Sequence, residues 1–408
     1  MTNTTTHTKA APCYIRGCGF HSALGQSHPE IHARLHQGQS SDMIVSQDML
    51  NDGTATVIGK VSATLPNLPA EMASFDTFNN RLALSALLQI EPQIQHAISQ
   101  YGHQRIAVVM GSSTSGIADG ETALAQQQSQ GHFPESFHYH QQELGNLSEF
   151  VADYFKLEGP TYTISTACSS SGRVFITAQR LLAAGLADAV LVGGVDSLCK
   201  LTLNGFHGLD ALSDELCNPF SANRKGINIG EAAGFMLLSH SPAKNTKDGT
   251  NIALLGAGDS SDAHHISAPH PEGNGAEQAM RKALTNAGLE PQDIGYINAH
   301  GTATPLNDEM EAKAIHRVFG NQVPVSSTKP LTGHTLGAAS AVEAAICWHV
   351  LMYNLSLPYQ VNDGDIADTL APIQLAKQGS TLNNKAILSN SFAFGGNNIS
   401  LIFGYVHD

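Results

Sequence analysis

The stretch YTISTACSSSGRVFITAQRLLAAGLAD (162–188), followed by AVLVGGV (189–195), carries the clearest fold signal in the chain. Residues 161–166 alternate as in a strand, and the apolar residues after 172 recur at helical spacing. AVLVGGV is typical of a buried strand. The order strand, sharp turn at 167–171, helix, strand places Cys168 at the turn where the helix begins.

The rest of the chain alternates strands and helices in the same style. The expected strands are 105–111, 252–258, 294–299, 323–329, 386–392 and 399–406, the last two paired around the loop AFGGNN, and the expected helices are 275–288, 308–319 and 335–353. This alternation favours an α/β fold with a mostly parallel sheet covered by helices.

The two parts of the chain have similar orders of elements, which is a hint of internal duplication. Residues 1–12 look like a loose tail, and the polar stretch HSPAKNTKDGT (240–250) is the best linker candidate. We therefore expect two units, 1–250 with the nucleophilic cysteine and 251–408 with two reactive histidines.

Composition excludes several classes of protein. Of the 408 residues, 42% are apolar and 14% charged, which suits a globular chain with a large core. The net charge of −14 without a basic stripe argues against nucleic-acid binding. The N-terminus has no apolar signal core, and the apolar helix-like stretch at 341–353 is too short to span a bilayer. We expect a cytoplasmic protein without a membrane span.

Cys168 is the first candidate for chemistry. A helix N-terminus has unpaired N–H groups and a partial positive charge, which favour a thiolate. Small neighbours in ACSSSG leave the sulfur accessible. A buried structural cysteine is about as probable at this position. It is the favoured interpretation for the five other cysteines, which form no C-x-x-C pair or zinc motif: Cys13, Cys18, Cys199, Cys217 and Cys347.

Two histidines occupy turns of the same kind. His300 follows the expected strand 294–299, and His334 lies between a strand and a helix rich in small residues. Strand ends followed by polar loops are where α/β folds place reactive groups. A denser cluster, DAHHISAPH (262–270), suggests a metal site, but its spacing fits no common metal motif.

Four motifs carry a family resemblance across residues 13–406: STACSSSG, NAHGTATPLND, STKPLTGHTLGAAS and SNSFAFGGNN. Together they resemble the elongating β-ketoacyl-acyl-carrier-protein synthases, members of the thiolase fold. The resemblance implies a five-layered α-β-α-β-α architecture built from two pseudo-repeated halves. It also implies an acyltransferase of fatty-acid or polyketide synthesis.

The implied reaction is a decarboxylative condensation. Cys168 would take an acyl group from a carrier-protein thioester, and a malonyl thioester would lose carbon dioxide and attack that group. By similarity, His300 and His334 donate hydrogen bonds to the malonyl thioester oxygen as it gains charge. The backbone N–H groups of Cys168 and Phe394 would form the oxyanion hole for the acyl carbonyl. Lys329 and Glu343 are expected to hold His334 and the local charge balance.

The resemblance also assigns substrate contacts. Thr302 and Thr304 match positions that contact the pantetheine arm. Phe392 and Phe394 match the acyl pocket and its gate, and two glycines would let the gate loop move: Gly395 and Gly396. In some relatives a monovalent cation is held by residues that match Asn298, Glu343, Ser389 and Asn390. No resident cofactor is expected, because the substrate carries phosphopantetheine on its carrier protein.

The chain departs from the family pattern at two positions of the last motif, Ala393 for glycine and Asn397 for threonine. Alanine could restrict the gate loop. The segment 211–234 is shorter than in most fatty-acid enzymes and resembles condensing enzymes of aryl-polyene and type II polyketide clusters. The implied partners are an acyl carrier protein, with Arg224 as a docking residue, and a second subunit in a homodimer or a heterodimer with a related ketosynthase-like chain.

Four rival interpretations are weaker. A biosynthetic thiolase needs a second cysteine in the last motif, and a chain-initiating synthase has asparagine in place of His334. A non-catalytic chain-length partner usually lacks the cysteine that this chain has at Cys168. A cysteine hydrolase would need a base and a residue to orient it, which the sequence does not show.

Overall fold

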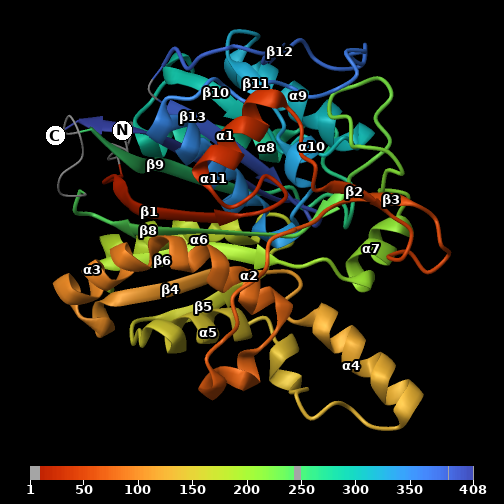
Figure 1. Cartoon of the computed structure of the whole chain (residues 1–408). Coiled ribbons are helices and arrows are strands. Elements are labelled where there is room, and N and C mark those ends of the chain that lie inside the picture. Colours follow the sequence, from red (N-terminus) through yellow and green to blue (C-terminus); the bar gives the residue numbers. More distant parts are fainter. Residues whose placement is uncertain (1–9, 243–249, 385, 408) are drawn as a thin grey trace.

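The structure is a computed structural model that describes residues 10–242, 250–384 and 386–407. Most of the expected tail and the centre of the expected linker lie outside these residues, so both interpretations, and the boundary at 250, stay predictions. Within the described part, strands and helices alternate as the sequence indicates. They form layers around one eleven-stranded sheet, whose two halves join at one seam (Figure 1).

The first sheet half is built from the N-terminal part of the chain. Its strands lie in the spatial order β5 (Thr161–Ile164), β4 (Ile106–Gly111), β6 (Ala189–Asp196), β8 (Ala232–Ser239) and β1 (Cys13–His21). Strand β4 pairs in parallel with β5 and β6, whereas β8 is antiparallel to β6 and β1. All residues of β4 and β6 are buried, as expected for strands with both faces covered.

The second sheet half repeats this order. Its strands are β11 (Pro324–Ser326), β10 (Ile294–Asn298), β13 (Ala386–Phe392), β14 (Asn397–His407) and β9 (Thr250–Ser261), with β12 (Gln374–Leu375) added outside β11. Again one strand, β10, has two parallel neighbours, and β14 is antiparallel to both of its own. The halves join where Cys13 and Tyr14 of β1 pair with Leu254 and Ala253 of β9.

This topology confirms the α/β fold of two pseudo-repeated halves and corrects one detail. The expected sheet was mostly parallel, but each half is mixed. The cause is the last strand of each half. In the first half, β8 lies between β6 and the first strand β1 and is antiparallel to both. In the second half, β14 lies in the same way between β13 and the first strand β9. The expected pairing of 386–392 with 399–406 around a loop is confirmed as the antiparallel pair β13–β14.

Helices complete the five layers. The middle layer holds α6 (Ser170–Ala183) and α11 (Ala339–Tyr353), which pack between the sheet halves (Figure 1). Nearly every residue of α11 is buried, as expected for a helix that is apolar all round. The outer layers contain α2 (Phe78–Leu87), α3 (Glu91–Tyr101) and α5 (Asn146–Phe155) on one side and α8 (Asn274–Ala287) and α9 (Pro305–Phe319) on the other.

The remaining elements lie outside these layers or cap them. They are α1 (His28–Gln37), α4 (Ile117–Gln130), α7 (Lys200–His207), the short α10 (Lys329–Thr332) and a small sheet of β2 (Met43–Ser46), β3 (Thr56–Gly59) and β7 (Ile229–Gly230). Helix α4 projects from the body as an arm (Figure 1). The segment Leu336–Tyr353 is long and apolar enough to cross a membrane, but 89% of it is buried inside the protein. The expectation that this stretch is too short to span a bilayer is therefore wrong, but its burial identifies it as a core helix.

Candidate active site

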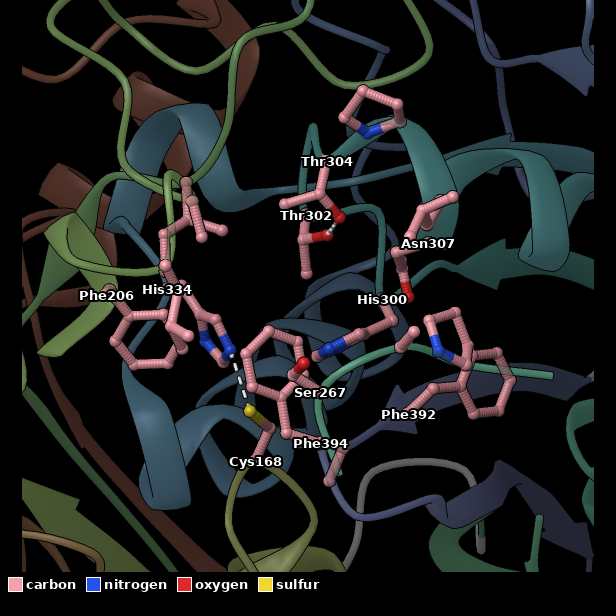
Figure 2. Close-up of a pocket in the computed structure, with 18 of the residues that line it drawn as sticks. Cys168, Phe206, Ser267, His300, Thr302, Thr304, Asn307, His334, Phe392 and Phe394 are labelled. Carbon is pink, nitrogen blue, oxygen red and sulfur yellow. Dashed lines mark hydrogen bonds between the residues drawn. The ribbon is translucent and has the colours of Figure 1, made fainter. Parts of the chain in front are cut away.

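Cys168 lies in a tight turn between β5 and α6 (Figure 2). The residue before it, Ala167, has a φ of +52°, a strained value for a residue with a side chain. Ser170 stabilises this turn, since its hydroxyl accepts from the Thr166 N–H at 2.8 Å and donates to the Ala167 carbonyl at 2.6 Å. Close packing also requires Gly111 at the end of β4, where a Cβ would meet the Ser171 nitrogen at 2.5 Å. The turn thus fixes the sulfur just before the start of α6.

The resting state of the Cys168 thiol differs from the sequence expectation. Burial raises its pKa to about 11, although Lys329 and the backbone N–H groups of Phe394 and Cys168 act in the opposite direction. The expected thiolate at rest is therefore wrong, because desolvation outweighs the helix N-terminus. A base must take the thiol proton as the sulfur reacts, and Nε2 of His334 lies 3.0 Å from Sγ.

The two histidines face one cavity from separate turns of the second half. Their ring centroids are 5.3 Å apart with nearly perpendicular planes. Burial, followed by the charge of Lys329, holds the pKa of both rings well below the usual value. Both rings are therefore neutral at pH 7, which suits hydrogen-bond donors and a proton acceptor better than fixed cations. Cys168, His300 and His334 meet at one point, as predicted (Figure 2).

Lys329 is buried beside His300. Its Nζ donates to the His300 carbonyl and to Glu343 Oε1, both at 2.5 Å, and lies 3.4 Å from His300 Nδ1. A donor at Nδ1 leaves the ring proton on Nε2, the nitrogen free to donate elsewhere. The prediction that Lys329 and Glu343 hold His334 is therefore wrong, because Lys329 bonds to His300 and Glu343, and Glu343 bonds in addition to Ser391.

Three buried carboxylates that position the site were missed. Glu311 accepts the backbone N–H groups of His300 and Gly301 at 2.8 and 2.7 Å. Asp308 accepts the Ala303 N–H in the same loop, where Ala303 has a φ of +63°. Asp196, at the end of β6, accepts hydrogen bonds from residues 112–114 and from the Ala338 N–H. Asp308 is the last residue of the motif NAHGTATPLND and Glu311 lies three positions beyond it, and that proximity to His300 is the only signal that the sequence offered.

A cavity of about 260 Å³ leads to the sulfur. Its lining includes Cys168, both histidines, Phe392 and both threonines assigned to the pantetheine arm. Those threonines, Thr302 and Thr304, lie together with 2.9 Å between their hydroxyl oxygens (Figure 2). The cavity therefore joins the expected arm contacts to the expected nucleophile in one space.

The gate loop lies against this cavity. The Phe394 ring lies 5.6 Å from that of Phe206, between centroids. Gly395 and Gly396 have φ values of +81° and +76°, so glycine is required there; whether the loop moves stays a prediction. Ala393 is not among the described residues with positive φ, so alanine costs no backbone strain at that position.

Arg224 was expected to be a docking charge, and its surroundings contradict that role. Its side chain is only 5% exposed and pairs with Glu309 at 2.8 Å, while also donating to the Ser221 carbonyl. A guanidinium whose hydrogen bonds are made inside the protein cannot reach a partner.

The residues matched to a cation site do not form a free cage of oxygens. Glu343 is paired with Lys329, and the Asn390 amide donates to Glu311 while its oxygen accepts from Ser400. Asn298 Oδ1 is buried without a hydrogen-bond partner within the described residues, and the Ser389 hydroxyl bonds to the Cys347 thiol. The cation at these residues stays a prediction.

Metal chemistry has little support elsewhere. In the described part of the chain, Cys168, His300 and His334 are the only group whose donor atoms converge closely enough for a metal, and the ammonium of Lys329 beside His300 opposes a cation there. The rings of His264 and His270 are tilted against each other with centroids 5.0 Å apart, and they do not belong to such a group. The expected absence of a resident cofactor stays a prediction.

Fold and site together define a thiol acyltransferase of the thiolase fold. The family models "Beta-ketoacyl synthase, N-terminal domain" and "Beta-ketoacyl synthase, C-terminal domain" match residues 11–243 and 252–362. The chain belongs to the β-ketoacyl synthase family, which confirms the resemblance.

Relatives agree with this assignment. Nodulation protein E of Rhizobium sp. (strain N33) is 32% identical over 96% of this chain and 98% of its own length. The 3-oxoacyl-[acyl-carrier-protein] synthase 2 of Rhizobium meliloti (strain 1021) is 39% identical over 60% of this chain, and the match spans 61% of that relative. Among solved structures, the ketosynthase ApeO in complex with its chain length factor ApeC from Xenorhabdus doucetiae is 46% identical, with a TM-score of 0.92 over 99% of this chain and 100% of that one.

Proposed function

We propose that this chain is a β-ketoacyl-acyl-carrier-protein synthase that joins a Cys168-bound acyl group to a malonyl unit. One observation carries the proposal: the Cys168 sulfur lies 3.0 Å from His334 Nε2 at the base of a cavity that His300 also lines. A buried structural cysteine would have no reason to face a cavity with two neutral imidazoles.

The first half-reaction loads the enzyme. As the sulfur attacks the thioester carbonyl, the thiol proton passes to His334 Nε2, and the C–S bond to the carrier breaks. The carrier thiol leaves with that proton. The N–H groups of Cys168 and Phe394, which lie near the sulfur, would hold the carbonyl oxygen while it is negatively charged.

The second half-reaction forms the carbon–carbon bond. The bond to the malonyl carboxylate breaks, carbon dioxide leaves, and the electron pair forms an enolate. Its oxygen accepts hydrogen bonds from His300 and from His334, whose ring proton moves from Nδ1 to Nε2 by exchange with water between the two half-reactions. The enolate carbon attacks the acyl carbonyl, and Cys168 leaves as thiolate and takes up one proton from solvent, the proton that the overall condensation consumes. Lys329, by donating to His300 Nδ1, keeps the donor proton on Nε2.

The pathway and the assembly are proposed from the comparisons. ApeO, which is 46% identical to this chain, is described in complex with a chain length factor. We propose the aryl-polyene or type II polyketide branch for this chain, with a heterodimer as the working unit, an acyl carrier protein as substrate carrier and a cytoplasmic location. A non-catalytic partner role is disfavoured because Cys168 is present.

Mass spectrometry of the intact protein tests the central claim. Incubation with an octanoyl thioester should add one octanoyl mass to Cys168, and Cys168→Ser should take up none and lose condensation. Cys217→Ser is the matched control, since Cys217 is also fully buried but does not line the cavity. Acylation at another residue, or condensation by Cys168→Ser, would contradict the proposal.

A further inference from the structure

Asp196, at the end of β6, is a fully buried carboxylate that neither half-reaction uses. Its Oδ1 accepts four hydrogen bonds from residues 112–114, in the loop after β4, at 2.7–2.9 Å. Its Oδ2 accepts the backbone N–H of Ala338, the residue before α11, at 2.9 Å. The two oxygens of one carboxylate therefore connect the first half of the molecule to the start of the helix that follows His334.

The chain between His334 and α11 is a tight, strained turn. Leu336 has a φ of +50°, a costly value for a residue with a branched side chain. A Cβ on Gly337 would meet Asp196 Oδ2 at 2.8 Å and the backbone nitrogen of Ser113 at 2.9 Å, so the turn lies directly against the carboxylate. Strained turns persist only where their surroundings hold them, and Asp196 holds the end of this one.

The place of the His334 ring depends on both ends of this turn. At the near end, the His334 N–H donates to the Asn228 carbonyl at 2.6 Å, and the His334 carbonyl accepts the Gly230 N–H at 3.1 Å. At the far end, Ala338 is held by Asp196. A shift at Ala338 therefore moves the chain that carries the imidazole, whereas the Cys168 turn has its own support from Ser170.

We propose that Asp196 is a positioning residue that sets the separation between His334 Nε2 and the Cys168 sulfur. The inference rests on the proposed function and specifies how its first proton transfer is aligned. A base must lie within hydrogen-bond reach of the proton that it takes, and Nε2 is 3.0 Å from Sγ. Displacement of the turn would remove this base without altering either reacting group.

The variant Asp196→Asn exchanges one atom and tests the contact with Ala338. The amide oxygen can replace Oδ1 and keep the hydrogen bonds from residues 112–114, which leaves the amide NH₂ opposite the Ala338 N–H, donor against donor. The limiting rate of Cys168 acylation by octanoyl-pantetheine should fall about 10–100-fold at pH 7, since a misplaced general base loses much of its effect. The half-saturating concentration should not change, because Thr302 and Thr304 lie on another loop.

The pH profile of acylation separates a misplaced base from general damage. In the wild type, the pKa of Cys168 is raised to about 11 and that of His334 is well below its usual value, so acylation should be flat between pH 7 and pH 9. Without an aligned base the sulfur must react as thiolate, a fraction that grows about tenfold per pH unit below the pKa. The rate of Asp196→Asn should therefore rise steeply over this range, while the charged groups that act on the thiol, Lys329 and Glu343, are unchanged. Equal loss at every pH overturns the proposal.

A second variant approaches the same contact from the other side. Gly337→Ala keeps the carboxylate but drives the turn away from it, because the new Cβ would meet Asp196 Oδ2. It should show the same rise of rate with pH, and it decides the question if Asp196→Asn does not fold. Asp119→Asn is the matched control, since the partly buried Asp119 of α4 accepts the Phe78 N–H at 3.0 Å and does not line the cavity. This control should keep the wild-type rate and the flat profile.

The wild type separates this proposal from the one on which it rests. Acylation of Cys168 in the wild type, together with flat profiles in Asp196→Asn and Gly337→Ala, would remove the positioning role and leave the proposed function intact. No acylation of Cys168 in the wild type would remove both.

Discussion

The two halves of the molecule share a strand order but carry different chemistry at equivalent turns. In the first half, the turn between β5 and α6 holds Cys168; in the second, the connection between β11 and α11 holds His334. The strands β4 and β10 also correspond, and they are followed by Ser112 and His300. The repeated topology therefore determines which turns can hold reactive side chains. The residue type at each turn determines its chemical role.

The halves also differ in how their turns are held. In the first half, the carboxylate of Asp196 accepts four hydrogen bonds from residues 112–114 and therefore fixes a loop without titratable groups. In the second half, Glu311 and the Lys329–Glu343 pair hold the loop of His300. In the second half, buried charged side chains therefore surround the loop of His300, whose ring acts as a neutral donor.

The largest expected effect comes from breaking the charge pair of the second half. Lys329→Met leaves Glu343 without its cation in a site where the two side chains are 1% and 3% exposed. Loss of one partner of a buried pair costs roughly 3–5 kcal/mol of unfolding free energy. Urea denaturation measures this cost, and condensation should also fall because His300 loses the donor at Nδ1.

The control for this pair is the double variant Lys329→Met/Glu343→Gln, which removes both charges. It should recover part of the lost stability but not the condensation rate, because Nδ1 of His300 remains without its donor. Strictly additive losses in stability would show that the two side chains do not act as a pair.

The next effect separates the two histidines. His300→Ala should lower condensation by about 10²–10³-fold, the usual cost of losing one oxyanion donor, while Cys168 still takes up an acyl group. His334→Ala should slow both half-reactions, because His334 Nε2 also lies 3.0 Å from the sulfur that must lose its proton. Stopped-flow acylation followed by product analysis distinguishes the two. Equal loss of both half-reactions in His300→Ala would show that this division of roles is wrong.

The positions of the reactive side chains at these turns could be predicted from the sequence. The turns of Cys168, His300 and His334 follow local signals, because each comes after an apolar strand and contains small residues. The partners of Lys329 could not be predicted, since its contacts depend on how α10 and α11 pack against the loop after β10. The raised pKa of Cys168 depends on burial by distant segments, which a local helix-terminus argument omits.

The Arg224 prediction failed for the same reason. The dipeptide Arg224-Lys225 looks like a solvated basic pair, but Glu309 of α9 lies against Arg224 from 85 positions away. Likewise, the mixed sheets could not be predicted from alternation alone, because strand order is set by packing of the two halves around α6 and α11.

The smallest expected effect concerns pH. Because burial holds the pKa of His300 and His334 well below the usual value, both rings stay neutral at pH 6, where an exposed imidazole would be about three-quarters protonated. Condensation of small thioesters should therefore change less than about twofold between pH 8 and pH 6. A midpoint of the pH–rate profile near pH 6.5 would mean that one of these rings is solvated.

Burial also lowers the pKa of His21 to about 4, below its value in the unfolded chain. The contribution of His21 to the stability of the fold is therefore complete above about pH 6.5 and declines as the pH falls toward 4. Urea unfolding at pH 7.5 and pH 5 should show that decline and mark the acid limit of the kinetic assay.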